Sequence, residues 1–154
     1  MQLRRLKGLP PIQGTAIDYA PSMLAGAVRR LKRKPGWKVE LADATHLPYA
    51  NESFETINVA NALHSIPNAK QAITEAFRVL RPGGTLAVNV ILPPRGGKLT
   101  RSIANRINAW GMRKGILVRP YEEEETRAMF LTAGFQILQT QVRGNDYYLL
   151  LKKP

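Results

Sequence analysis

Short apolar segments alternate with segments of helical periodicity along this chain, and no other feature restricts its fold as strongly. Three of the apolar segments run into a polar residue, at Asp18, Asp43 and Asn61. Alternating strands and helices favour a parallel sheet that is covered by helices on both faces. The sequence therefore predicts an α/β protein with polar side chains at the carboxyl ends of three strands.

One helix is specified better than the other elements, and it begins after Asn68. Asn68 can cap the helix, and Gln71 lies where the partner of a capping box belongs. Residues 81–84, Arg-Pro-Gly-Gly, end it, and a buried strand follows over residues 85–92. Apolar side chains recur along one face of this helix at Ala69, Ala72, Ile73, Ala76, Phe77 and Leu80.

Further elements are predicted on both sides of this helix. A helix begins at Pro21, because proline is favoured at the first helical position. Another helix covers residues 122–132, and a closing antiparallel hairpin follows it. The predicted strands cover residues 14–18, 37–42, 54–61, 135–142 and 147–152.

The composition excludes several classes of site. The chain has no cysteine and two isolated histidines, His46 and His64, which excludes a disulfide framework and argues against a metal site. Its longest apolar runs are far shorter than the roughly 20 residues that span a bilayer, and no signal-peptide pattern opens it. With 154 residues, 44% of them hydrophobic, the chain can form one domain with a core. We expect a cytosolic protein.

Basic residues outnumber acidic ones by 23 to 11, which favours anionic surfaces such as nucleic acid or acidic lipid. The last group of basic residues along the chain runs from Lys98 to Arg119. Within it four apolar residues share a helical face, Leu99, Ile103, Ile107 and Trp110. Four cations surround that face, Arg101, Arg106, Arg113 and Lys114. We predict that residues 93–119 form a basic amphipathic lid, and we add peripheral contact with an anionic membrane as a second expectation.

Asp18 ends a strand where nucleotide-cofactor folds place an acid that accepts hydrogen bonds from ribose hydroxyls. Such folds have a glycine-rich turn about 20 residues before the acid. Only 17 residues precede Asp18, and they hold two isolated glycines, Gly8 and Gly14. Residues 1–7 look like the last turns of the helix that follows the glycine turn. We therefore expect an N-terminally truncated domain that, as an isolated chain, binds its cofactor poorly.

Four motifs carry a family resemblance: Asp-Ala-Thr-His-Leu-Pro-Tyr at 43–49, Ser-Phe-Glu at 53–55, Ala-Leu-His-Ser-Ile at 62–66 and Phe-Arg-Val-Leu-Arg-Pro-Gly-Gly at 77–84. Together they resemble the class I methyltransferases, and more narrowly the branch with the ubiquinone and menaquinone C-methyltransferases. The similarity covers most of residues 14–154. It implies one partial methyltransferase domain over residues 1–154, with a Rossmann-like parallel sheet, helices on both faces and a C-terminal antiparallel hairpin. The first strand and its glycine-rich turn are lacking.

The resemblance also implies that S-adenosylmethionine is the co-substrate. It places six residues at this cofactor, Asp18, Tyr19, Asp43, Ala44, Ala60 and Asn61. In the first pair, Asp18 lies at the ribose, whose two hydroxyls its carboxylate can bind. The second pair lies at the adenine, and the third beside the methionine portion and the methyl group. No catalytic residue is implied, because methyl transfer from a sulfonium depends mainly on positioning.

Structural roles remain open for three of the polar side chains. Asp18 is also suited to the start of a helix, and Asp43 to closing a loop through backbone hydrogen bonds. His64 is a candidate general base, but packing or capping is the alternative for it.

Three functions are compatible with these patterns. The first is a methyltransferase, or a fragment of one, that acts on a small, lipid-like or quinone-like acceptor. The second is a noncatalytic remnant or partner subunit, which the lack of a glycine turn favours. The third is a nucleic-acid methyltransferase, which the charge favours. We do not expect a nucleic-acid partner, because residues 60–63, Ala-Asn-Ala-Leu, lack the Pro-Pro-aromatic run that stacks a flipped base.

Overall fold

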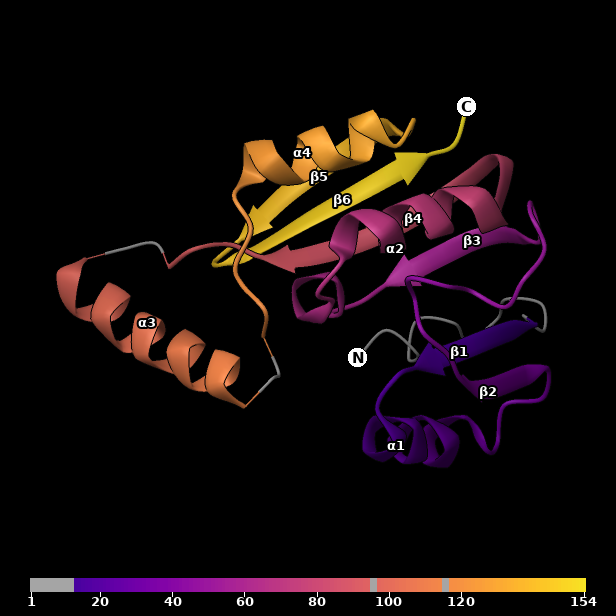
Figure 1. The fold of residues 1–154 in the computed structure, drawn as a ribbon, viewed down its shortest axis with the longest axis horizontal. Coiled ribbons are helices and arrows are strands. Elements are labelled where there is room, and N and C mark those ends of the chain that lie inside the picture. Colours follow the sequence, from indigo (N-terminus) through magenta and orange to yellow (C-terminus); the bar gives the residue numbers. More distant parts are fainter. Residues whose placement is uncertain (1–12, 95–96, 115–116) are drawn as a thin grey trace. The chain divides into compact units, whose positions relative to one another are not determined.

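The strands form two sheets in the computed structural model, which describes residues 13–94, 97–114 and 117–154, without the side chains of residues 98–101 and 104. One sheet belongs to a compact unit that ends at Ala44, and the other to a unit over Thr45–Pro154. Figure 1 gives the order of the elements along the chain. The predicted helix end at residues 1–7 lies outside the described residues, as do the side chains of Leu99 and Arg101.

The smaller unit contains β1 (Gly14–Asp18), α1 (Pro21–Leu31) and β2 (Trp37–Leu41). β1 and β2 pair in parallel, with Gly14 beside Trp37 and Asp18 beside Leu41. A Cβ atom at Gly14 would lie 2.8 Å from the Trp37 ring, so the close approach of this ring requires glycine. Pro21 is the first residue of α1, as predicted.

The larger unit is built on a four-stranded sheet in the order β3-β4-β6-β5. β3 (Phe54–Val59) pairs in parallel with β4 (Leu80–Ile91). β6 (Asp146–Lys152) pairs antiparallel with β4 and with β5 (Gln136–Arg143), so the predicted terminal hairpin is confirmed. The α/β fold with parallel strand pairs is confirmed as well.

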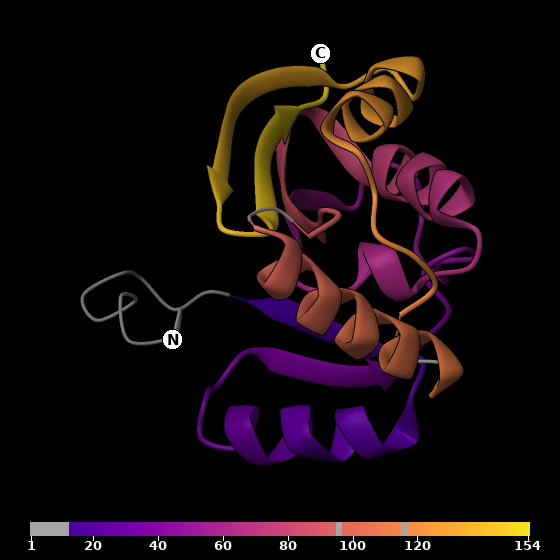
Figure 2. The ribbon, with the colours of Figure 1, turned by 90° about the vertical axis from the view of Figure 1, so that its left-hand side faces the viewer.

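Two helices, α2 (Ala69–Val79) and α4 (Glu123–Thr132), cover the same face of this sheet, as Figures 1 and 2 show. The Asn68 side chain accepts a hydrogen bond from the Gln71 N–H at 3.2 Å, which confirms the predicted cap. Alternate residues of β4 face these helices and are buried, because successive side chains of a strand point to opposite faces. The core contains Ile73, Leu86, Val88, Val90, Phe130, Phe135, Tyr147, Leu149 and Leu151.

Two further helices lie in the larger unit. η2 (Leu63–Ser65) is a short 3-10 helix after β3, and α3 (Lys98–Arg113) is the predicted amphipathic helix. The Arg-Pro-Gly-Gly segment differs from the prediction, because it belongs to β4 and does not lie between helix and strand as a separate turn. A Cβ atom at Gly84 would lie 2.9 Å from the carbonyl oxygen of Glu55, so β3 and this part of β4 approach closely only with glycine here.

Lys153 is a buried cation at the C-terminal end of α2. Lys153 is 9% exposed, and its Nζ donates hydrogen bonds to the carbonyl oxygens of Phe77 (3.0 Å) and Leu80 (2.8 Å). The last carbonyl groups of a helix have no partner within the helix. Lys153 therefore satisfies acceptors of α2 from the end of the chain.

We predict that Lys153→Met lowers the free energy of unfolding by about 1–3 kcal/mol, because it leaves buried carbonyl groups without a donor. Urea denaturation followed by circular dichroism measures the change. Lys152→Met is the matched control, since Lys152 is only partly buried and we expect a change within about 0.5 kcal/mol. Equal effects of the two substitutions would contradict the capping role of Lys153.

Candidate functional site

Asp18 is the last residue of β1, and its carboxylate has two different surroundings. Oδ1 accepts a hydrogen bond from the N–H of Ala20 at 2.9 Å. One oxygen of Asp18 therefore has the alternative role, because it binds the backbone just before helix α1. Within the described residues Oδ2 makes no hydrogen bond. A ribose hydroxyl can approach this second oxygen.

Three more of the predicted residues lie at the same end of the two-stranded sheet. Tyr19 is exposed and directly follows β1, and Asp43 and Ala44 follow β2. The register brings these segments together, because Asp18 pairs with Leu41 and its carbonyl oxygen accepts a hydrogen bond from the N–H of Ala42 at 3.3 Å. The smaller unit therefore gathers four predicted residues at the carboxyl ends of its parallel strands, the usual ligand-binding edge of such sheets.

The other two predicted residues, Ala60 and Asn61, follow β3 in the larger unit. Asn61 has φ of 53°, in the left-handed region that few residues other than glycine adopt. Its N–H donates to Oδ1 of Asn89 at 2.9 Å, and Nδ2 of Asn89 donates to Oδ1 of Asn61 at 2.5 Å. This reciprocal pair holds the strained backbone after β3, and such backbone conformations cluster at functional sites.

Asn89 holds one of the predicted residues in place, and the sequence prediction did not include it. It lies in β4 and is 8% exposed, whereas the residues on both sides of it are apolar. A single amide within the apolar run of residues 85–92 was the available signal, because a buried polar side chain needs a hydrogen-bond partner. The partner could not be predicted from spacing, since it follows a different strand.

His64 lies in η2 and is 5% exposed, so the structure buries the candidate general base. Burial lowers the pKa of His64 from its usual value of 6.5, and the nearby Asp146 carboxylate opposes this change. Among the described residues Nδ1 of His64 has no hydrogen-bond partner. The imidazole is therefore part of the interior, which agrees with the alternative role in packing.

The loop after the predicted adenine-contacting pair is held by α2. The Arg78 guanidinium donates to the carbonyl oxygens of Leu47 (3.0 Å) and Tyr49 (2.7 Å). Glu75 accepts hydrogen bonds from Arg78 and from the N–H of Leu47 at 2.8 Å, and the bonds from Arg78 lower the pKa of Glu75. The motif at residues 43–49 and the arginine of the motif at residues 77–84 are thus parts of one hydrogen-bonded arrangement.

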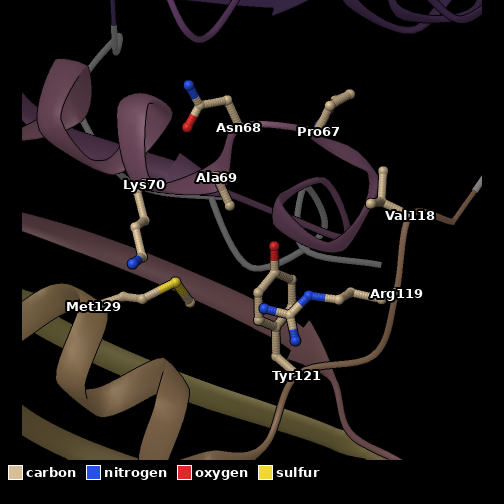
Figure 3. Close-up of a pocket in the computed structure, with 8 residues that line it drawn as sticks. All are labelled: Pro67, Asn68, Ala69, Lys70, Val118, Arg119, Tyr121 and Met129. Carbon is tan, nitrogen blue, oxygen red and sulfur yellow. The ribbon is translucent and has the colours of Figure 1, made fainter.

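A cavity of about 180 Å³ lies beside the N-terminus of α2 (Figure 3). In this view the Arg119 guanidinium lies over the Tyr121 ring, 4.3 Å from its centre, and Lys70 and Met129 line the same cavity. Ligand pockets usually have volumes of roughly 300–1,000 Å³. Because the cavity is smaller and none of the six predicted residues lines it, it is a poor candidate for the cofactor site.

Comparison with known proteins gives a family match. Residues 2–88, more than half of the chain, match the family model described as "Methyltransferase domain". The chain is 37% identical over 73 residues to the ubiquinone/menaquinone biosynthesis C-methyltransferase UbiE of Bartonella quintana, covering 46% of this chain and 28% of that protein. It is 31% identical over 104 residues to the phthiotriol/phenolphthiotriol dimycocerosates methyltransferase of Mycobacterium leprae, covering 68% and 34%.

These alignments span about a third of the length of the two curated relatives. Among solved structures, a putative methyltransferase from Bacillus halodurans superposes with a TM-score of 0.72 and covers 99% of this chain and 97% of that chain. Its sequence identity is 16%, so this similarity concerns the fold alone.

We predict that Asn89→Ala lowers the free energy of unfolding by about 1–3 kcal/mol, because it removes two hydrogen bonds that contribute roughly 0.5–1.5 kcal/mol each. Urea denaturation measures the change. Asn105→Ala, which removes the same group from an exposed position of α3, is the control and should change stability by less than about 0.5 kcal/mol. An Asn89→Ala protein as stable as this control would show that the amide pair does not hold Asn61.

Proposed function

The chain belongs to the methyltransferase domain family, and from this premise we propose that it is a class I methyltransferase that uses S-adenosylmethionine and acts on a small, lipid-like or quinone-like acceptor. The observation that carries the proposal is the position of the six predicted residues. In each unit they follow the carboxyl ends of parallel strands, where open α/β sheets bind ligands.

The described side chains fit the chemistry of the co-substrate. Asp18 has a carboxylate oxygen that can accept hydrogen bonds from a vicinal diol. The Asn61–Asn89 pair fixes the backbone after β3, so it can present the polar groups of this turn to a ligand without rearranging. Both features are preorganised by hydrogen bonds within their own unit.

S-adenosylmethionine supplies an activated methyl group, which moves to the electron pair of the acceptor while the bond between methyl carbon and sulfur breaks. The acceptor also loses a proton. The part of this chain is to bind the donor, orient the acceptor and exclude water. The proposal assigns no proton transfer to His64, which is buried in the larger unit.

The proposed class of acceptor is supported by the names of the relatives. One is named for ubiquinone and menaquinone, and another for phthiotriol dimycocerosates.

We predict that Asp18→Ala weakens S-adenosylmethionine binding by at least about tenfold, since each hydrogen bond to a charged group contributes roughly 1.5–3 kcal/mol. Isothermal titration calorimetry of both proteins measures the affinities. Glu55→Ala, which removes an exposed carboxylate near the amino end of β3, is the control and should bind like the unchanged chain.

Equal affinities of the Asp18→Ala protein and the unchanged chain would contradict the ribose assignment. Absence of binding by the unchanged chain would favour the partner-subunit function. Thermal unfolding of each variant shows whether the lost hydrogen bond to Ala20 has altered the fold instead of the contact with the ligand.

A further inference from the structure

α3 presents an apolar stripe to solvent. Ile103, Ile107 and Trp110 are four and three residues apart and therefore share one face of the helix. They are 53%, 62% and 51% exposed, respectively. Together with Arg106 they line one open depression on the surface. Three large apolar residues at helical spacing that remain exposed are unusual on a helix that packs only on its own protein.

The charges around this stripe have a single sign. Residues 98–114 contain five lysines and arginines and no aspartate or glutamate. Arg106, Arg113 and Lys114 are exposed, and within the described residues none of them forms an ion pair. Arg106 and Arg113 lie within about 60° of Trp110 around the helix axis, because each residue turns an α-helix by about 100°. Cations thus border the apolar stripe directly.

This combination is typical of helices that lie in the interface of a membrane. Apolar side chains enter the boundary between headgroups and acyl chains, tryptophan prefers this depth, and basic side chains contact anionic headgroups. No helix in the described part of the chain is long and apolar enough to cross a membrane.

Two other occupants fit the helix less well. A second copy of the chain would bring the basic border of one α3 against that of another, and the like charges would repel. Nucleic acid would be attracted by the cations through its phosphates, but such binding does not account for an exposed stripe of isoleucines. An anionic lipid surface complements both the charge and the apolar stripe.

We propose that α3 docks in the plane of an anionic lipid bilayer, with Ile103, Ile107 and Trp110 at the headgroup boundary and Arg106 and Arg113 on lipid phosphates. This docking does not depend on the proposed methyl transfer, because it concerns a surface of α3 and no cofactor. The docking would bring the protein to a membrane in which lipid-like molecules are dissolved.

Co-sedimentation with vesicles tests the docking. The probes are vesicles of phosphatidylcholine alone and vesicles that also contain phosphatidylglycerol, each at low and high salt. We expect binding to the anionic vesicles only, with weaker binding in high salt. Ile107→Glu and the double variant Arg106→Glu/Arg113→Glu should each weaken binding by about tenfold or more.

The matched control is Arg29→Glu/Arg30→Glu on α1, which makes the same change in net charge at two exposed arginines. We expect this protein to keep most of its vesicle binding. An equal loss in the α1 and α3 double variants would overturn the proposal, because it would show attraction by net charge alone. Binding that is insensitive to Ile107→Glu and is displaced by an oligonucleotide would also overturn it, in favour of nucleic acid.

Tryptophan fluorescence gives a second measurement that does not depend on the charge variants. The chain has two tryptophans, and Trp37 is packed beside Gly14 in the smaller unit. On anionic vesicles the emission should shift to shorter wavelength and be quenched by brominated acyl chains, and Trp110→Phe should remove both effects. No shift in the unchanged protein, or a shift that persists in Trp110→Phe, would contradict insertion of α3.

Discussion

The larger unit depends on the burial of one strand, β4. Leu86, Val88 and Val90 point to one face of the sheet and are covered by α2 and α4, and each such buried side chain contributes roughly 1.5–3 kcal/mol. β4 also has a neighbouring strand on each edge, β3 in parallel and β6 antiparallel. Without this strand neither the helices nor the terminal hairpin would have a surface on which to pack.

The same strand determines the geometry of the candidate site in this unit. Because Val88 faces the core, its neighbour Asn89 points to the opposite face. The parallel register places Val88 beside Val59, so Asn89 reaches the turn that follows β3. The amide pair between Asn61 and Asn89 is therefore a consequence of core packing on one face and register along the strand. Here the forces that stabilise the fold also position the residues proposed to bind the cofactor.

Local patterns predicted much of this fold, because the interactions concerned are local. The cap of α2 by Asn68 joins residues three positions apart, and the buried stripe of α2 follows from helical periodicity. The features that were missed connect residues far apart in the sequence. Asn89 and Asn61 are 28 positions apart, and Lys153 and Leu80 are 73 positions apart. Spacing does not reveal such partners, since they depend on strand register and on where the chain returns.

For the candidate site, the positions of the residues could be predicted but the interactions around them could not. The resemblance supplied six residues at strand ends, and those positions do lie at the end of β1 or just after β1, β2 and β3. It did not supply the interactions around them, such as the hydrogen bond from Ala20 to Asp18 and the Arg78 bonds to the loop after Ala44. These are hydrogen bonds between side chains and the backbone of turns. They depend on the conformation of each turn, which the sequence pattern does not specify.

Binding of S-adenosylmethionine by these strand-end residues is tested most directly by an NMR titration. Adding S-adenosylhomocysteine to the ¹⁵N-labelled chain registers weak as well as tight binding, residue by residue. We predict saturable shifts at the amides of Asp18, Tyr19, Asp43 and Asn61. Shifts confined to the cavity near Lys70 and Tyr121, or no saturable shift at the strand ends, would contradict this assignment.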